Sequence, residues 1–212
     1  GQKTIPFRIL ETLNWEVPDW LVYPGGALGN TSSCGKALME LHEWGWIKKI
    51  PRIAVINARG ANTLFQLVNG IFDDEKLNWN DGNPNFGLIE KFYGEMKKDE
   101  SLKPKTKATA IQIGKPSNIA KGLRALDFTN GIVEQVTDKE MLDGMSVVGL
   151  NGFDCEMASG ASVAGIKKLR DKEIIKKDDK VVGVLTGRQK EPLLPIDYHN
   201  NGENLFARPP KN

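Results

Sequence analysis

Cysteine and histidine are scarce in this chain of 212 residues, which contains two of each. Cys34 and Cys155 lie far apart in sequence, and so do His42 and His199. None of the four shows the short ligand spacing of a zinc site, so no metal centre is expected. Two isolated thiols instead indicate reduced, unpaired cysteines, as found in a reducing compartment.

An excess of charge of one sign is also lacking. Lys and Arg number 29 and Asp and Glu number 27, which gives a formal net charge of +2. This balance gives no reason to expect a nucleic acid or an anionic membrane as partner. No apolar run approaches the roughly 18 residues of a membrane span, and no leader-like segment opens the chain. We therefore expect a cytoplasmic protein, although a transit peptide on a longer precursor would not be visible here.

Short aliphatic runs rich in β-branched residues predict strands that are covered on both faces. These runs are 20–23, 53–56, 108–111, 131–133 and 181–185. Segments with helical periodicity lie between them, at 33–44, 118–128 and 159–169, and Thr137 with Glu140 forms a capping-box pattern. Alternating strands and helices predict an α/β fold with a mostly parallel open sheet and helices on both faces.

The domain organisation follows from breaks in this pattern. Residues 1–187 read as one α/β domain, interrupted at about 73–107 by a polar stretch rich in Asn and mixed charge. We expect that stretch to be a surface insertion with one short helix at about 88–96. Residues 188–212, rich in Pro, Asn and Gly, are expected to form a C-terminal tail.

The sharpest local feature is the segment from Pro24 to Thr31, which reads Pro-Gly-Gly-Ala-Leu-Gly-Asn-Thr. It follows a predicted strand and precedes a helix that is expected to begin near Thr31 or Ser32. Glycines let peptide N–H groups approach an anion without obstruction, and a helix start adds free N–H groups and a positive dipole end. The segment therefore predicts a phosphate cradle, with a tight turn that binds no ligand as the alternative.

Two common phosphate motifs do not match this segment. The dinucleotide fingerprint needs another glycine spacing and an acid after the next strand, where Asn57-Ala58-Arg59 stands instead. Arg59 could meet a 2′-phosphate, so an NADP module stays open as a minor alternative. A Walker A loop fails because five residues separate Gly29 from Gly35-Lys36, where the motif has four.

A longer pattern resembles a known family. Residues 15–20 followed by 24–30 resemble the segment that threonine synthases, which are pyridoxal-phosphate (PLP) enzymes of fold type II, place around the cofactor phosphate. The family usually has Gly-Gly-Asn-Leu-Gly-Asn there, so Ala27 departs from it. Further segments resemble the family in the same order, and together they cover roughly 1–187 except the insertion: 46–52, 108–116, 131–134, 159–165 and 185–187.

This resemblance implies a PLP site on the large-domain part of such an enzyme. The implied cofactor-binding residues are Gly25, Gly26, Ala27, Leu28, Gly29, Asn30 and Thr186. The Thr186 hydroxyl would face the pyridine nitrogen, where a neutral group favours an unprotonated ring. Asn30 can also be a plain helix N-cap, and Thr186 a strand-end threonine bonded to its own backbone. Arg188 follows Gly187 where the family usually has histidine, so the resemblance does not predict which side chains form the site wall at this position.

The resemblance also shows what is missing. The family binds PLP covalently through a lysine in a Ser-Phe-Lys-Asp-like segment far upstream of the glycine segment, and no such segment occurs here. No catalytic residue is therefore assigned, and the chain alone is expected to be inactive.

The parent enzyme implied is a carbon–oxygen lyase that converts O-phosphohomoserine and water to threonine and phosphate. The chain would need the missing N-terminal half, and a homodimer is left open. A serine or threonine dehydratase and a non-catalytic phosphate-binding module are the alternatives.

Overall fold

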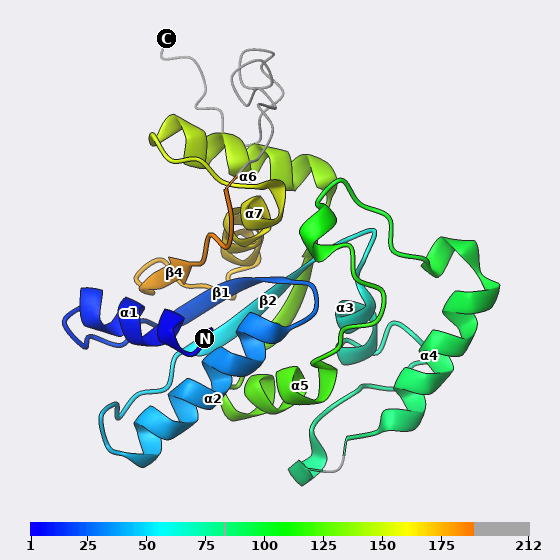
Figure 1. Cartoon of the computed structure of the whole chain (residues 1–212), viewed down its shortest axis with the longest axis horizontal. Helices are drawn as coiled ribbons and strands as arrows, with labels where there is room; N and C mark the ends of the chain where they lie inside the picture. Colours follow the sequence, from blue (N-terminus) through cyan, green and yellow to red (C-terminus); the bar gives the residue numbers. More distant parts are fainter. Residues whose placement is uncertain (83, 189–212) are drawn as a thin grey trace.

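The computed structural model describes residues 1–82 and 84–188 and is built on a four-stranded parallel sheet (Figure 1). The strand order is β3-β2-β1-β4, with every neighbouring pair parallel. The strands are β1 (Trp20–Gly25), β2 (Arg52–Ala58), β3 (Ile132–Val136) and β4 (Val181–Gly183). The expected α/β class is confirmed.

Helices cover both faces of the sheet (Figure 1). Alternate side chains of β1 point to opposite sides, so that Leu21 and Tyr23 join one hydrophobic core while Trp20 and Val22 join the other. On the Leu21 side lie α2 (Gly29–Glu43) and α5 (Ile119–Phe128). On the Trp20 side α7 (Met157–Asp171) packs on the sheet, and α6 (Asp138–Leu150) packs on α7.

The contact between α6 and α7 depends on glycine. A Cβ atom added at Gly160 would lie 2.2 Å from the carbonyl oxygen of Met141, and one added at Gly144 would lie 2.5 Å from the carbonyl oxygen of Gly160. The two helix backbones therefore touch directly at this crossing, where no side chain separates them.

The segment 73–107 differs from the expected surface insertion. It contains α4 (Phe86–Lys98), which is longer than predicted and buries an apolar stripe of Leu88, Ile89, Phe92 and Met96 in the core on the Leu21 side of the sheet. The polar composition of the segment hides this stripe, because only one face of the helix is apolar. The smaller elements are α1 (Thr4–Thr12), α3 (Thr63–Val68), η1 (Asn80–Gly82), η2 (Glu100–Leu102) and η3 (Thr109–Ile111).

Two predicted strands need correction. The run 108–111 is not a strand but contains the 3-10 turn η3, which lies against the glycine segment instead of joining the sheet. The run 181–185 forms a strand only as far as Gly183.

The capping box of Thr137 and Glu140 at the start of α6 is confirmed. Within the described residues, no helix is long and apolar enough to cross a membrane.

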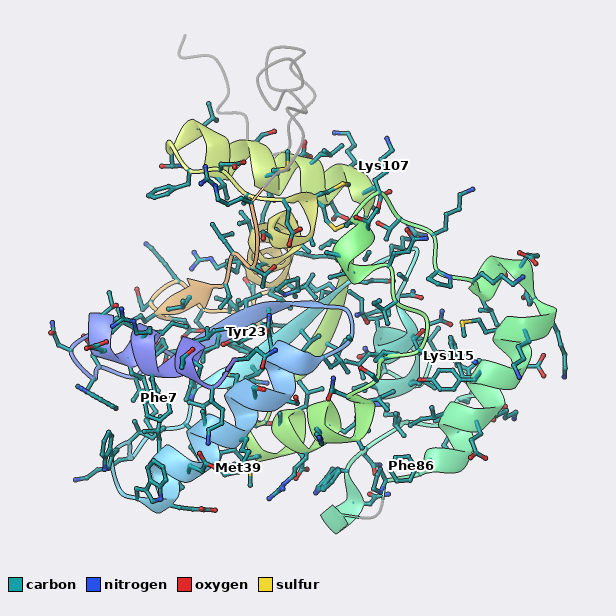
Figure 2. All side chains as sticks on the ribbon, in the orientation of Figure 1. Phe7, Tyr23, Met39, Phe86, Lys107 and Lys115 are labelled. Atoms are coloured by element: carbon teal, nitrogen blue, oxygen red, sulfur yellow. The ribbon has the colours of Figure 1, made fainter. Side chains whose placement is uncertain are left out.

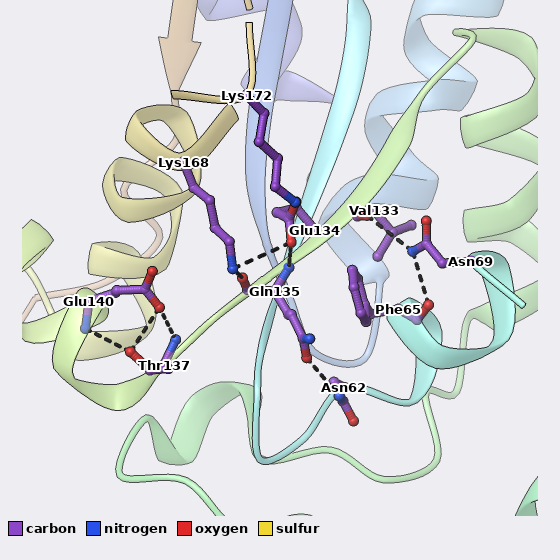
Figure 3. Close-up of polar contacts among 10 residues, drawn as sticks. All are labelled: Asn62, Phe65, Asn69, Val133, Glu134, Gln135, Thr137, Glu140, Lys168 and Lys172. Carbon is purple, nitrogen blue, oxygen red and sulfur yellow. Dashed lines mark hydrogen bonds and ion pairs between the residues drawn. The ribbon is translucent and has the colours of Figure 1, made fainter. Parts of the chain in front are cut away.

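A buried carboxylate ties β3 to α7 (Figure 3). Glu134 is 5% exposed and pairs with Lys172 and, at 3.6 Å, with Lys168. Burial raises the pKa of Glu134, but the hydrogen bonds from Lys172 and the Gln135 N–H and the charges of both lysines outweigh it, so the pKa lies below its usual value.

Glu134→Gln removes the charge that pairs with both lysines, so we expect it to lower the free energy of unfolding at pH 7. The loss should be only about 1–2 kcal/mol, because both lysines are partly exposed to water. A lowered folded pKa means that this stabilisation is present above the unfolded pKa of about 4.3 and disappears as the pH falls through the folded pKa. Urea unfolding of both proteins between pH 3 and pH 7 measures the difference, which should shrink toward acid. Glu100→Gln, at an ion pair with an 83% exposed carboxylate, is the control and should change little. An equal effect of the two substitutions would contradict the prediction.

Candidate functional site

The glycine segment turns directly from β1 into α2. Leu28 occupies the N-cap position with a φ of 65°, and α2 begins at Gly29, earlier than predicted. No side chain caps this helix, so the alternative role of Asn30 as N-cap is wrong. Within the described part of the chain, no acceptor meets the backbone N–H groups of Gly29, Asn30 and Thr31. A helix start with free N–H groups is a site for an anion.

Two asparagines fix the path of this segment. Asn57, 2% exposed at the end of β2, donates from Nδ2 to the Gly25 carbonyl at 2.8 Å and accepts from the Phe65 N–H at 2.9 Å. A Cβ atom at Gly25 would lie 2.6 Å from that amide nitrogen, so only glycine fits. The carbonyl of Ala27 accepts from both the backbone and the side-chain N–H of Asn118, each at 3.1 Å. The cradle is therefore held rigidly from both sides.

The wall opposite the segment is η3. A Cβ atom at Gly26 would approach the Ile111 Cα to 3.1 Å, so the two backbones are nearly in contact. At Gly29, in contrast, an added Cβ would meet nothing closer than Asn118 Nδ2 at 3.9 Å. The Thr31 hydroxyl is buried and has no hydrogen-bond partner. An open position, free N–H groups and an unpaired hydroxyl together suit a phosphate group.

Thr186 supplies the third wall, three positions beyond the end of β4. The Ser159 hydroxyl oxygen, at the start of α7, accepts from the Thr186 N–H at 2.8 Å and from the Gly187 N–H at 3.2 Å. The Thr186 hydroxyl donates to the Glu156 carboxylate at 3.4 Å. This exposed segment is therefore positioned by α7 and not by the sheet.

These walls enclose a cavity of about 260 Å³ at the carboxyl end of β1. In the strand order β3-β2-β1-β4, β2 lies on one side of β1 and β4 lies on the other. The strand order therefore reverses at β1, and the cavity lies at this point. Ligand sites in open α/β sheets commonly lie at such a reversal. All predicted site residues except Gly25 line it. Its lining includes Gly26, Ala27, Leu28, Gly29, Asn30, Thr31, Ile111, Glu156 and Thr186. Among the described residues, no lysine lines it.

Sequence reasoning missed Asn57 and Glu156. In the sequence, Asn57 is informative only as a position where a dinucleotide-binding protein would have an acid. Its role could not be predicted, because its bond to Gly25 joins residues 32 positions apart. Glu156 was missed because α7 was expected to begin at Ser159, although it begins at Met157 with Glu156 as its N-cap residue. Glu is not a preferred N-cap residue, and Glu156 makes no side-chain cap bond, so the sequence has no clear signal for that boundary.

The cysteines take no part in this site. Cys34 and Cys155 are both free and buried. Burial raises the pKa of the Cys34 thiol to about 12 and that of the Cys155 thiol to about 11. Both side chains therefore stay protonated near neutral pH and are poor nucleophiles.

Curated relatives match most of the length of this chain. The chain is 35% identical over 189 residues to threonine synthase of Methanocaldococcus jannaschii, which covers 88% of the chain and 41% of the relative. It is 34% identical over 209 residues to threonine synthase 2, chloroplastic, of Arabidopsis thaliana, which covers 98% of the chain and 36% of the relative. The chain thus spans less than half the length of these curated relatives.

Solved structures share the fold at low sequence identity. A fungal L-serine ammonia-lyase from Rhizomucor miehei superposes with a TM-score of 0.65 at 19% identity, over 95% of this chain and 55% of that one. The processed form of threonine deaminase isoform 2 from Solanum lycopersicum gives 0.61 at 12% identity, over 90% of this chain and 46% of that one. Such neighbours show the fold of fold-type II PLP enzymes.

The family comparison covers most of the chain. The family model described as "Pyridoxal-phosphate dependent enzyme" matches residues 1–187, which include all three walls of the cavity. The chain therefore belongs to the family of pyridoxal-phosphate dependent enzymes.

Proposed function

We propose that this chain is the cofactor-phosphate part of a threonine synthase. The observation that carries the proposal is the cradle of free N–H groups at the start of α2, facing Thr186 across the point where the strand order reverses. Its identity of 34–35% to two threonine synthases over most of its length supports the choice of this enzyme.

Each wall of the cavity has a proposed role. The N–H groups of Gly29, Asn30 and Thr31 would bind the cofactor phosphate, with the unpaired Thr31 hydroxyl as a further donor. Thr186 would meet the ring nitrogen, and its hydroxyl proton then has two acceptors, that nitrogen and the Glu156 carboxylate. When bound, pyridoxal phosphate supplies an electron sink that stabilises negative charge on the substrate carbon.

The reaction needs groups that the described residues do not provide. No lysine lines the cavity in that part of the chain, and its volume of about 260 Å³ is below the ~300–1,000 Å³ usual for a ligand pocket. We therefore propose that the chain is inactive alone and works with an upstream part that carries the cofactor lysine. The whole enzyme would convert O-phosphohomoserine and water to threonine and phosphate.

A dehydratase is the second candidate, because an L-serine ammonia-lyase and a threonine deaminase share the fold. Their low identity of 12–19% makes this reading weaker than the first. A module that binds a phosphate group without catalysis is the third.

Cofactor binding followed by complementation tests the three readings. First, PLP is titrated into the chain, followed by absorbance, then treated with borohydride and analysed by mass spectrometry. We expect saturable binding with no lysine adduct. Next, the part of the M. jannaschii threonine synthase that the chain does not match is added as a second polypeptide. Phosphate release from O-phosphohomoserine supports threonine synthase, whereas ammonia release from serine or threonine favours the dehydratase. A folded chain that binds no PLP would overturn the proposal.

A further inference from the structure

A second cavity, larger than the cofactor cavity, lies in a groove of about 420 Å³ between α2 and α5. One wall is the α2 stripe of Ser33, Lys36 and Met39, with Met39 labelled in Figure 2. The other wall is the α5 stripe of Lys121 and Arg124, one helical turn apart. Among the residues that the structure describes, only Gly29 lines both this basic groove and the cofactor cavity.

The basic groove carries uncompensated positive charge. Lys3 and Lys36 both pair with Glu40, and the Lys36 distance is 3.9 Å. Lys121 and Arg124 are exposed and, in the described part of the chain, have no acidic partner. No Asp or Glu lines the groove among these residues. A concave surface lined by cations of one sign attracts anions and concentrates them locally.

Donors that suit an oxyanion lie beside these charges. The Ser33 hydroxyl lines the groove and has no hydrogen-bond partner among the described residues, whereas the Asn118 side-chain amide, which also lines it, already donates to Ala27 and Ser117. Ser33 lies in the first turns of α2 and Lys121 in the first turn of α5, so both side chains lie near the positive dipole ends of their helices. An arginine guanidinium such as that of Arg124 can bind a phosphate through two parallel N–H groups.

We propose that the basic groove is a second anion site, for a small ligand with a phosphate or phosphate-monoester dianion. The groove volume of about 420 Å³ favours a small molecule, and the net charge of only +2 on the whole chain gives no reason to expect a large polyanion. The site does not depend on the proposed reaction, since Ser33, Lys121 and Arg124 do not line the cofactor cavity.

Residue-resolved titration tests this site independently of PLP. The ¹⁵N-labelled chain is titrated with inorganic phosphate and, in parallel, with glycerol phosphate, and amide shifts are followed by NMR. We expect saturable shifts at Ser33, Lys121 and Arg124, with an affinity separate from any at Gly26 or Leu28. Tighter binding of the ester identifies a phosphorylated metabolite as the ligand, and tighter binding of the inorganic ion identifies free phosphate.

Charge-matched variants separate a site from general attraction. Lys121→Gln with Arg124→Gln should weaken the groove affinity about tenfold or more, because hydrogen bonds to charged groups are lost. Lys48→Gln with Lys97→Gln removes the same charge from exposed positions elsewhere and should leave the affinity within about twofold. Equal weakening by both pairs, non-saturating shifts, or shifts confined to Gly26 and Leu28 would overturn the proposal. In each case the folded state is verified by the dispersion of the same spectra.

Discussion

Gly29→Val is expected to weaken PLP binding by about 100-fold while the chain keeps its stability. An added Cβ at Gly29 meets no protein atom closer than 3.9 Å, so we expect the fold to accept a side chain there. Gly29 carries one of the free N–H groups of α2 and lines the cavity where the cofactor phosphate is proposed to bind. We expect a valine side chain at this position to hinder the approach of the phosphate to its donors.

Absorbance titration with PLP and a thermal melt of the same sample measure the two effects. The matched control is Gly87→Val in the first turn of α4, where an added Cβ also has room, with Asn85 Oδ1 at 3.6 Å as its nearest neighbour. Both variants should melt within a few degrees of the parent chain, and only Gly29→Val should lose affinity. Unchanged PLP affinity in a folded Gly29→Val chain would place the cofactor phosphate elsewhere.

Gly160→Ala is expected to lower the free energy of unfolding by about 3 kcal/mol. The new methyl group would overlap the Met141 carbonyl oxygen at 2.2 Å, and both partners are helix backbone that cannot rotate away. Relief requires α6 and α7 to separate, which costs about 1–3 kcal/mol or more for an overpacked interior and outweighs the better helix propensity of alanine. For a chain of this size the melting temperature should fall by roughly 6–12 °C.

The control for this substitution is Gly94→Ala in α4. Gly94 is also inside a helix, but nothing lies within 4 Å of an added Cβ, so alanine should stabilise the chain by about 0.5–1 kcal/mol. Urea unfolding of the two variants and the parent chain gives both values. The same Gly→Ala substitution should therefore lower the free energy of unfolding at position 160 and raise it at position 94. A Gly160→Ala chain as stable as the parent would show that the two helices do not touch as described.

The sequence predicts the parts of this fold that depend on local signals. The β-branched runs of β1 and β2 and the Thr137–Glu140 capping box carry their conformation in neighbouring residues, and all three are confirmed. The run 108–111 is different, because its conformation depends on contact with the distant Gly26 and not on its own propensity.

The candidate site also has a part that the sequence predicts and a part that it does not. The glycine segment is recognisable because glycine spacing is a local feature, and the structure brings Gly26, Gly29 and Thr186 around one cavity. The bonds that position the walls, from Asn57 to Gly25 and from Thr186 to Glu156, join residues 32 and 30 positions apart. A single sequence contains no signal for such pairs, so they could only be found in the structure.

The left-handed backbone of Leu28 has a consequence for the order in which the molecule folds. A non-glycine residue with a φ of 65° costs about 1–2 kcal/mol, and burial of a leucine side chain returns about 1.5–3 kcal/mol. Leu28 is 3% exposed and packs on Gly122 of α5, which is far along the chain. The left-handed conformation of Leu28 thus depends partly on its contact with α5. We therefore expect the cradle to be stable only when α5 is docked, and we expect an isolated peptide of residues 20–43 to lose its geometry.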